Sequence, residues 1–246
     1  METSPLIAGR LRELEQHESR VPEKRAVHEM RVAARRLRAA LRLLRLRELD
    51  QEVKALQDAL GRVRDLQVQA AWFRGRDAAL AREREGKLGS AGRALQRALQ
   101  RWRARTLPAL LEAAGEARPL HRRRAGKVVR KRLRRLEERL EQARTRPTPR
   151  TLHRARISVK QVRYLVEVAG DALPAKAARI AADLKPLQAS LGQLHDADVR
   201  IALLRGRPAL LREQKEARER LAKIAGAQLS RWRTQKVARR ARQRLR

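Results

Sequence analysis

Two stretches of this chain repeat each other and decide its predicted fold. HEMRVAARRLR at residues 28–38 recurs as HRARISVKQVR at residues 153–163. Further along, LQDALGRVRDLQV at 56–68 recurs as LQASLGQLHDADV at 187–199, and LQRWR at 99–103 recurs as LSRWR at 229–233. The three matches keep the same order and nearly the same offset, which predicts an internal duplication.

The composition favours helices. Aromatic residues make up only 2% of the 246 residues, and Leu, Ala, Arg and Glu outnumber the β-branched residues, which argues against a sheet. Turn residues divide each half into about four helical stretches. We therefore predict an all-α protein with two four-helix bundles packed side by side, with residues 1–118 as the first half and 119–246 as the second.

The helix expected at residues 28–45 carries separate basic and apolar faces. At 100° per residue, its basic side chains fall within an arc of about 100°, spanning roughly 25 Å. The apolar residues Met30, Ala33, Ala34, Leu37, Ala40, Leu41 and Leu44 occupy a wider arc. The basic positions, which we call the first stripe, are His28, Arg31, Arg35, Arg38, Arg42 and Arg45.

The second copy repeats this arrangement. Its basic positions, the second stripe, are His153, Arg156, Lys160 and Arg163. A solvated helix face normally mixes acids with bases at i, i+4, and the first stripe contains no acid. Retention of the pattern in duplicate favours a binding surface for a linear anion over a solvated face.

These motifs, with Leu-Gly-x-x-x-Asp downstream in each half, resemble those of the CHAD family, the conserved histidine α-helical domain. The resemblance covers essentially the whole chain. It implies two pseudo-symmetric four-helix bundles packed around a strongly basic cleft that holds inorganic polyphosphate. The expected contacts are the two stripes and Arg36, which belongs to the family motif. Gln161 stands where the first half has Arg36, and Tyr164 where it has Ala39, so the two halves can bind unequally.

The charge of the chain supports an anionic partner. Its 62 Lys and Arg against 27 Asp and Glu give a net charge of +35, which attracts polyanions at long range. Specific binders of single-stranded nucleic acid use stacking aromatics, and these are scarce here. Sequence-independent nucleic-acid binding remains the alternative, because binding to a duplex backbone needs only cations.

Other marked residues have local interpretations. His28 and His153 are either phosphate donors or partners in local pairs. Asp65 and Asp196 are expected to orient arginines through ion pairs, and Gly61 and Gly192 to permit close approach of helices. Trp102 and Trp232 are expected to pack in the core, whereas Arg93, Arg97, Arg101 and Arg105 recur every four residues and form a candidate second wall of the site.

The sequence lacks the patterns of an enzyme. It has no nucleotide-binding loop and no nucleophile elbow. Glu83-Arg-Glu85-Gly-Lys87 matches the signature of triphosphate tunnel enzymes, but that signature requires a β-strand, so we interpret it as coincidence. We expect no catalytic residues, no metal site and no cofactor.

Further expectations concern the environment of the protein. There is no cysteine, which excludes disulfides and thiolate metal sites. No apolar run is long enough to span a membrane, and no signal peptide is recognisable. We expect a cytoplasmic protein, associated with polyphosphate granules if it binds that polymer. Oligomeric state and chain-length preference are not determined by the sequence.

Overall fold

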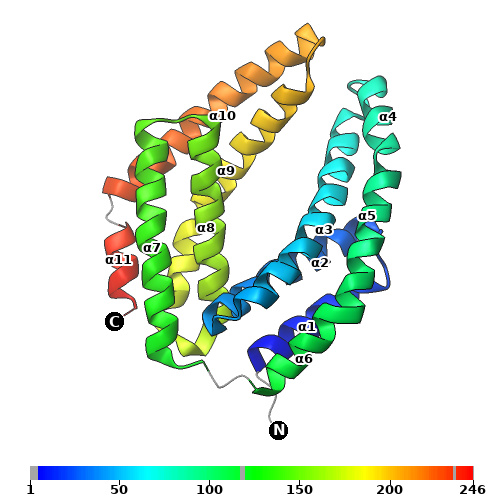
Figure 1. Cartoon of the computed structure of the whole chain (residues 1–246). Helices are drawn as coiled ribbons and strands as arrows, with labels where there is room; N and C mark the ends of the chain where they lie inside the picture. The colour runs from blue at the N-terminus through cyan, green and yellow to red at the C-terminus, as the bar shows by residue number, and fades with distance from the viewer. Residues whose placement is uncertain (1–4, 117–119, 235–236, 246) are drawn as a thin grey trace. The chain divides into compact units, whose positions relative to one another are not determined.

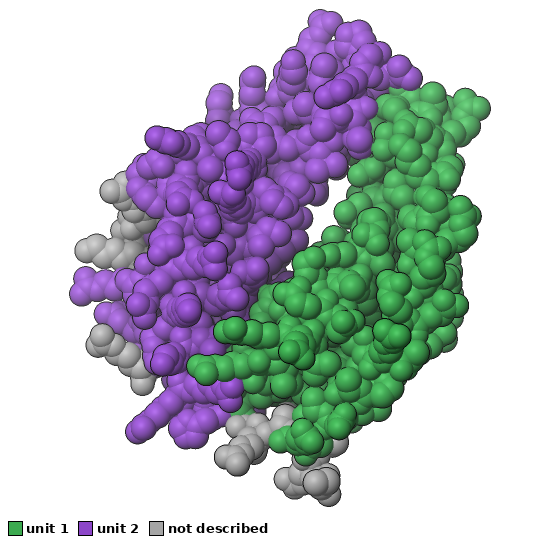
Figure 2. All heavy atoms as spheres, in the orientation of Figure 1, with its two compact units in different colours: residues 1–120 green, residues 121–246 purple. Residues whose placement is uncertain are grey.

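The computed structural model describes residues 5–116, 120–234 and 237–245, and every regular element within these ranges is helical (Figure 1). The all-α prediction is therefore confirmed. The chain divides into two compact units, Met1–Leu120 and His121–Arg246 (Figure 2). The boundary predicted at residues 118 and 119 lies outside the described residues.

Unit 1 contains four helical segments. They are α1 (Pro5–Glu18), α2 (Lys24–Leu44), α3 (Arg47–Phe73) and a final segment that is interrupted but continuous in direction (Figure 1). That segment comprises α4 (Ala78–Gly86), α5 (Leu88–Arg101), the π-helical turn η1 (Trp102–Thr106) and α6 (Leu107–Glu116). Helix α2 packs on α1 and α3, and α3 packs on α4 and α5.

Unit 2 is built in the same order. Its long helices are α7 (Arg122–Thr145), α8 (Pro149–Ala169), α9 (Ala178–Leu203) and α10 (Pro208–Thr234), followed by the short α11 (Val237–Gln243). Two 3₁₀ turns, η2 (Gly170–Ala172) and η3 (Ala175–Ala177), join α8 to α9. Helix α8 packs on α7 and α9, as α2 packs on its two neighbours.

The repeated segments lie on matching helices of the two units. The histidine-led segments lie in α2 and α8, the Leu-Gly segments in α3 and α9, and the Trp segments at the end of α5 and in α10. Common origin of the halves stays a prediction from the sequence. Because the repeated segments follow one another in the same order in both units, the basic residues of each copy lie on equivalent helices.

Apolar periodicity positions α2. The face predicted to be buried is buried from Met30 to Leu41, and Leu44 is half-buried at the end of the helix. Trp102, 1% exposed, joins the same cluster in unit 1, and Trp232 is buried in unit 2. Both tryptophans pack as predicted, and burial of the apolar face of α2 turns its basic face away from the core.

Helix α8 begins as the sequence indicates. Pro149 occupies its first turn, and the hydroxyl of Thr148 accepts a hydrogen bond from the Thr151 N–H in a capping box. This start fixes the register of His153, one turn further along the helix. Helix α2 differs, because Glu23 precedes Lys24 at its start and no side chain caps it.

Candidate functional site

The first stripe lies on the side of α2 that borders α3, where its arginines contact Asp50, Gln57 and Asp65. We call the surface along this helix pair the α2/α3 groove. The guanidinium of Arg31 reaches across to α3, where it forms an ion pair with Asp65 at 3.6 Å. It also passes over Gly61, where a Cβ would stand 3.4 Å from Nη2. The ion pair predicted for Asp65 is confirmed. The predicted reason for Gly61 was wrong, because the atoms close to it belong to an arginine side chain and not to a neighbouring helix backbone.

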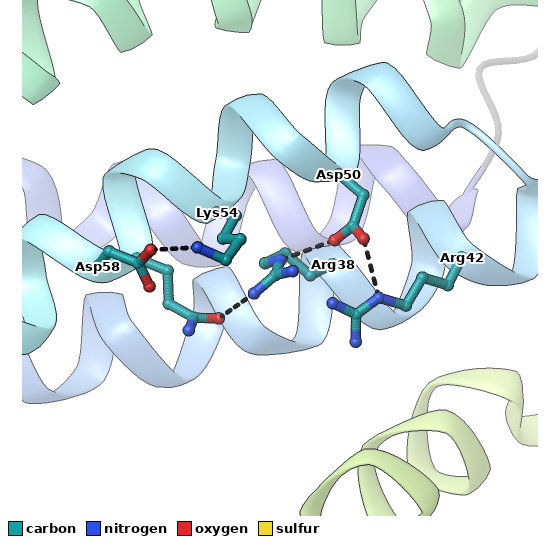
Figure 3. Close-up of polar contacts among 6 residues, drawn as sticks. Arg38, Arg42, Asp50, Lys54 and Asp58 are labelled. Carbon is teal, nitrogen blue, oxygen red and sulfur yellow. Dashed lines mark hydrogen bonds and ion pairs between the residues drawn. The ribbon is translucent and has the colours of Figure 1, made fainter. Parts of the chain in front are cut away.

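Asp50, a buried acid on α3, accepts hydrogen bonds from two arginines of the first stripe. Nε of Arg38 donates to one oxygen of Asp50 at 2.6 Å, and Nε of Arg42 donates to the other at 2.9 Å (Figure 3). Arg38 also donates to the Gln57 side chain at 3.2 Å. One carboxylate thus orients two guanidiniums and neutralises only one of their two charges. The first stripe contains no acid of its own, but α3 supplies Asp65 and Asp50. The helical wheel of α2 could not reveal the second of these.

Positively charged arginines surround His28 at the start of the first stripe. Arg35 is half-exposed and has no ion-pair partner within the described part of the chain. Partial burial lowers the pKa of His28, and the positive charges of Arg64, Arg35 and Arg31 lower it further. Arg64 comes from α3. His28 is therefore uncharged near pH 7, and the positive charge around it comes from these arginines.

Two predicted positions lie off the stripe. Arg36 is one residue past Arg35, hence about 100° around the helix, and its guanidinium forms an ion pair with Glu13 of α1 at 3.4 Å. Helix α2 ends at Leu44, and Arg45 adopts a left-handed conformation with φ of 66°. The projection of Arg45 onto the α-helical stripe was therefore wrong, since the helix has already ended there.

The second stripe lies along the groove between α8 and α9. His153, Arg156 and Lys160 are half-buried on α8. Nδ1 of His153 lies 3.3 Å from Nδ1 of His195 on α9, with ring centroids 4.6 Å apart. The local pairing considered for His153 is therefore present in the structure.

Burial and charge both keep this histidine pair neutral. Burial lowers the pKa of His195 to about 4, with further lowering by Arg156 and His153. The pKa of His153 is lowered by burial and by Arg156 and Lys160. Near pH 7 one ring donates its N–H to the other, and the fixed positive charge of the groove comes from Arg156 and Lys160.

The far end of the second stripe is compensated within its own helix. Nε of Arg163 lies 2.8 Å from Glu167, four residues later, and its guanidinium lies 5.5 Å from the ring centre of Tyr164. The basic face predicted for this helix is therefore neutralised at that end. The i, i+4 spacing of Arg163 and Glu167 was visible in the sequence.

Comparison with known proteins assigns this architecture. The family model described as CHAD domain matches residues 6–205. This chain belongs to the CHAD family. The crystal structure of the CHAD domain from the plant Ricinus communis is 24% identical, covers 100% of this chain and 91% of its own, and superposes with a TM-score of 0.64. No curated protein matches the chain.

The resemblance inferred from the two stripes is thus confirmed as family membership, and the family is associated with polyphosphate binding generally. The match ends at residue 205. It therefore includes both stripes and both Leu-Gly segments, but neither α10 nor α11.

This CHAD domain has two groove residues that the stripe analysis missed. Arg64 lies beside His28, and His195 lies against His153. Each directly precedes the aspartate of its Leu-Gly segment, so aligning the repeats pairs Arg64 with His195. Aligning the two Leu-Gly segments could therefore have identified both residues, because the neighbour of each motif histidine precedes the matched aspartate.

The matched aspartates and glycines do not behave alike in the CHAD domain. Asp196 is exposed and forms no ion pair within the described residues, so the arginine-orienting role predicted for it is absent there. An added Cβ at Gly192 would meet nothing within 4 Å, so a close-packing role for that glycine was wrong.

The chemistry offered by the two grooves is anion binding. Arginine guanidiniums donate paired hydrogen bonds to phosphate oxygens. Within the described ranges, no cluster of three or more histidine, aspartate and glutamate side chains is suited to hold a metal ion. None of the helices in the same ranges is long and apolar enough to cross a membrane.

Proposed function

We propose that this CHAD domain binds inorganic polyphosphate without transforming it, through the α2/α3 groove of unit 1 and the α8/α9 groove of unit 2. The observation that carries the proposal is the row Arg31, Arg35, Arg38 and Arg42 along one groove, in which Arg31 pairs with Asp65 while Arg38 and Arg42 share Asp50. The row keeps an excess of positive charge while its guanidiniums are held in place. Preorganised guanidiniums lose little conformational freedom when they bind.

The polymer suits these grooves because it presents one charge per unit and no bases. A binder of single-stranded nucleic acid would expose stacking rings. Trp102, Trp232 and Tyr164 are buried, and Trp72 packs edge-on against Phe73 with Arg76 over its ring. The described residues around the grooves therefore favour an anion recognised by charge and hydrogen bonding alone.

Charge reversal in each groove tests the proposal. We expect Arg35→Glu to weaken binding in unit 1, Lys160→Glu to weaken it in unit 2, and the double variant to abolish it, as measured by isothermal titration with polyphosphate. Arg25→Glu and Arg154→Glu are matched controls, because these exposed residues lie on α2 and α8 outside the stripes. Full affinity in the folded double variant would show that the site lies elsewhere.

Nucleic-acid binding is the competing function, since duplex phosphates also suit basic grooves. Competition at raised salt separates the two. We expect polyphosphate to displace duplex DNA of matched total charge, and equal affinity for both would favour a general polyanion binder. Release of orthophosphate during incubation with Mg²⁺ would contradict the non-catalytic part of the proposal.

A further inference from the structure

A second basic surface runs along the last helical segment of unit 1. Between Leu88 and Thr106 the sequence contains no aspartate or glutamate. Arg93, Arg97, Arg101 and Arg105 are all exposed along α5 and η1, and they have no ion-pair partner among the residues the structure describes. We call these four residues the α5 stripe. Like charges at i, i+4 destabilise a helix slightly, so this row has no structural benefit of its own.

The π-helical turn keeps the row together. In an α-helix, residues four apart drift about 40° around the axis at each step. A π-helical turn holds more residues than an α-helical one, and η1 covers Trp102–Thr106. The step from Arg101 to Arg105 therefore reverses part of the drift, and the stripe stays on one face for about 18 Å at 1.5 Å per residue.

The α5 stripe belongs to a helix that packs on α3. Arg103 of the same segment reaches Glu18 of α1, and Arg97 and Arg101 lie about 120° and 160° around the helix from Arg103. The first stripe borders α3 through Arg31, Arg38 and Arg42. Helix α3 therefore packs between the two helices that carry the two basic rows.

The surface of α3 carries one further cation that no acid compensates among the described residues. Arg62 is exposed and has no ion-pair partner within the described ranges, and Lys54 is also exposed, although it pairs with Asp58 at 2.5 Å. Neighbouring helices pack about 8–10 Å apart, so one flexible anionic chain can cross α3 from the first stripe to the α5 stripe. A short oligophosphate can occupy only one of them.

The α5 stripe is only partly duplicated. At the offset of the Trp match, Arg93 and Arg101 correspond to the basic residues Lys223 and Arg231 of α10, whereas Arg97 corresponds to Ala227. Helix α10 also mixes Glu213, Glu216 and Glu219 with its bases. The row free of acids is therefore a feature of unit 1, separate from the stripes that both halves share.

We propose that the α5 stripe is an additional subsite that binds the continuation of a long polyphosphate chain held by the first stripe, so that unit 1 favours long chains over short ones. This inference rests on the proposed function. The expected ligand is a flexible linear phosphate polymer, because the four arginines form an exposed straight row with no acid and no exposed aromatic ring within it.

The test compares two chain lengths and two double variants. Arg97→Gln with Arg101→Gln should lower affinity for long-chain polyphosphate roughly threefold to tenfold, in line with exposed charge pairs, and leave tripolyphosphate affinity unchanged. The salt dependence of long-chain binding should also become shallower, because fewer counterions are released. The matched control, Arg220→Gln with Lys223→Gln, removes two exposed charges from α10 and should change neither affinity.

Each other outcome overturns the inference in a recognisable way. Unchanged long-chain affinity in the α5 variant would show that the stripe makes no contact. Equal losses in both double variants would assign the effect to overall charge. Loss of duplex DNA binding alone would assign the stripe to nucleic acid. Absence of binding of either phosphate by the unaltered protein would overturn the proposed function, and this inference with it.

Discussion

Asp50 shows how a single residue organises a binding surface made of like charges. Arg38 and Arg42 lie four residues apart on α2 and would repel each other, yet both donate to this one buried carboxylate. The carboxylate fixes two guanidiniums while leaving a net positive charge. A residue that binds no ligand can therefore prepare a site for one.

We expect Asp50→Asn to destabilise unit 1 by about 2 kcal/mol, because hydrogen bonds to charged groups are stronger than neutral ones. Polyphosphate affinity should fall, because Arg38 and Arg42 lose the carboxylate that holds their guanidiniums in place. Urea denaturation and calorimetric titration measure the two effects. Asp58→Asn, which removes an exposed pair with Lys54, should cost under about 0.5 kcal/mol. Unchanged or increased affinity in the Asp50 variant would show that Asp50 competes with the ligand and does not prepare the site.

His195 links the stability of unit 2 to pH. Its pKa is lowered to about 4, chiefly by burial and then by Arg156 and His153. Asp196 and Asp198 oppose the lowering, and Asp198 is itself paired with Arg218 of α10 at 2.5 Å. Between pH 6.5 and about 4 the unfolded chain binds a proton at this residue that the native chain does not.

The contribution of His195 is therefore complete above pH 6.5 and is lost as the pH falls through that window toward 4. We expect His195→Gln to flatten the fall in the free energy of unfolding, by less than about 1.4 kcal/mol per pH unit because the ring is only partly buried. Urea denaturation at a series of pH values measures this slope. Identical slopes in the two proteins would show that His195 titrates normally.

At the scale of helices, the sequence predicted the apolar face of α2 and the burial of both tryptophans. It could not predict which acids reach the stripes, because Asp50 belongs to a different helix and meets Arg38 only after α2 and α3 pack. It also misplaced Arg45, since the left-handed end of a helix at a non-glycine residue leaves no clear signal in the sequence.

The two matched glycines give a prediction at this scale. Gly192→Ala should stabilise the protein by up to about 1 kcal/mol, because alanine favours the helix interior and its Cβ meets nothing. Gly61→Ala should stabilise it by a similar amount and leave polyphosphate affinity unchanged, because the new Cβ would make an ordinary van der Waals contact with the guanidinium of Arg31 at 3.4 Å. Thermal denaturation and titration of both variants test this. A loss of affinity in the Gly61 variant alone would show that Arg31 needs the space that the glycine leaves.

At the scale of the whole molecule, the net charge of +35 has opposite effects on folding and on binding. Self-repulsion destabilises a compact state, and salt screens it, with a Debye length of about 10 Å at 0.1 M that falls to about 3 Å at 1 M. The same screening weakens attraction to a polyanion, which is also driven by release of counterions. Salt should therefore stabilise the free protein and weaken its complex.

We expect the melting temperature of the free protein to rise between about 0.05 and 0.5 M NaCl as screening increases, by roughly 2–4 °C for each kcal/mol gained. Long-chain polyphosphate at low salt should raise it further by preferential binding to the native state, and this increment should shrink as salt is added. Thermal denaturation followed by circular dichroism, with and without polymer, measures both terms. A neutral osmolyte at equal osmolality controls for effects other than screening. If the rise in melting temperature caused by polyphosphate persists at high salt, hydrogen bonds to the arginines dominate binding and long-range charge does not.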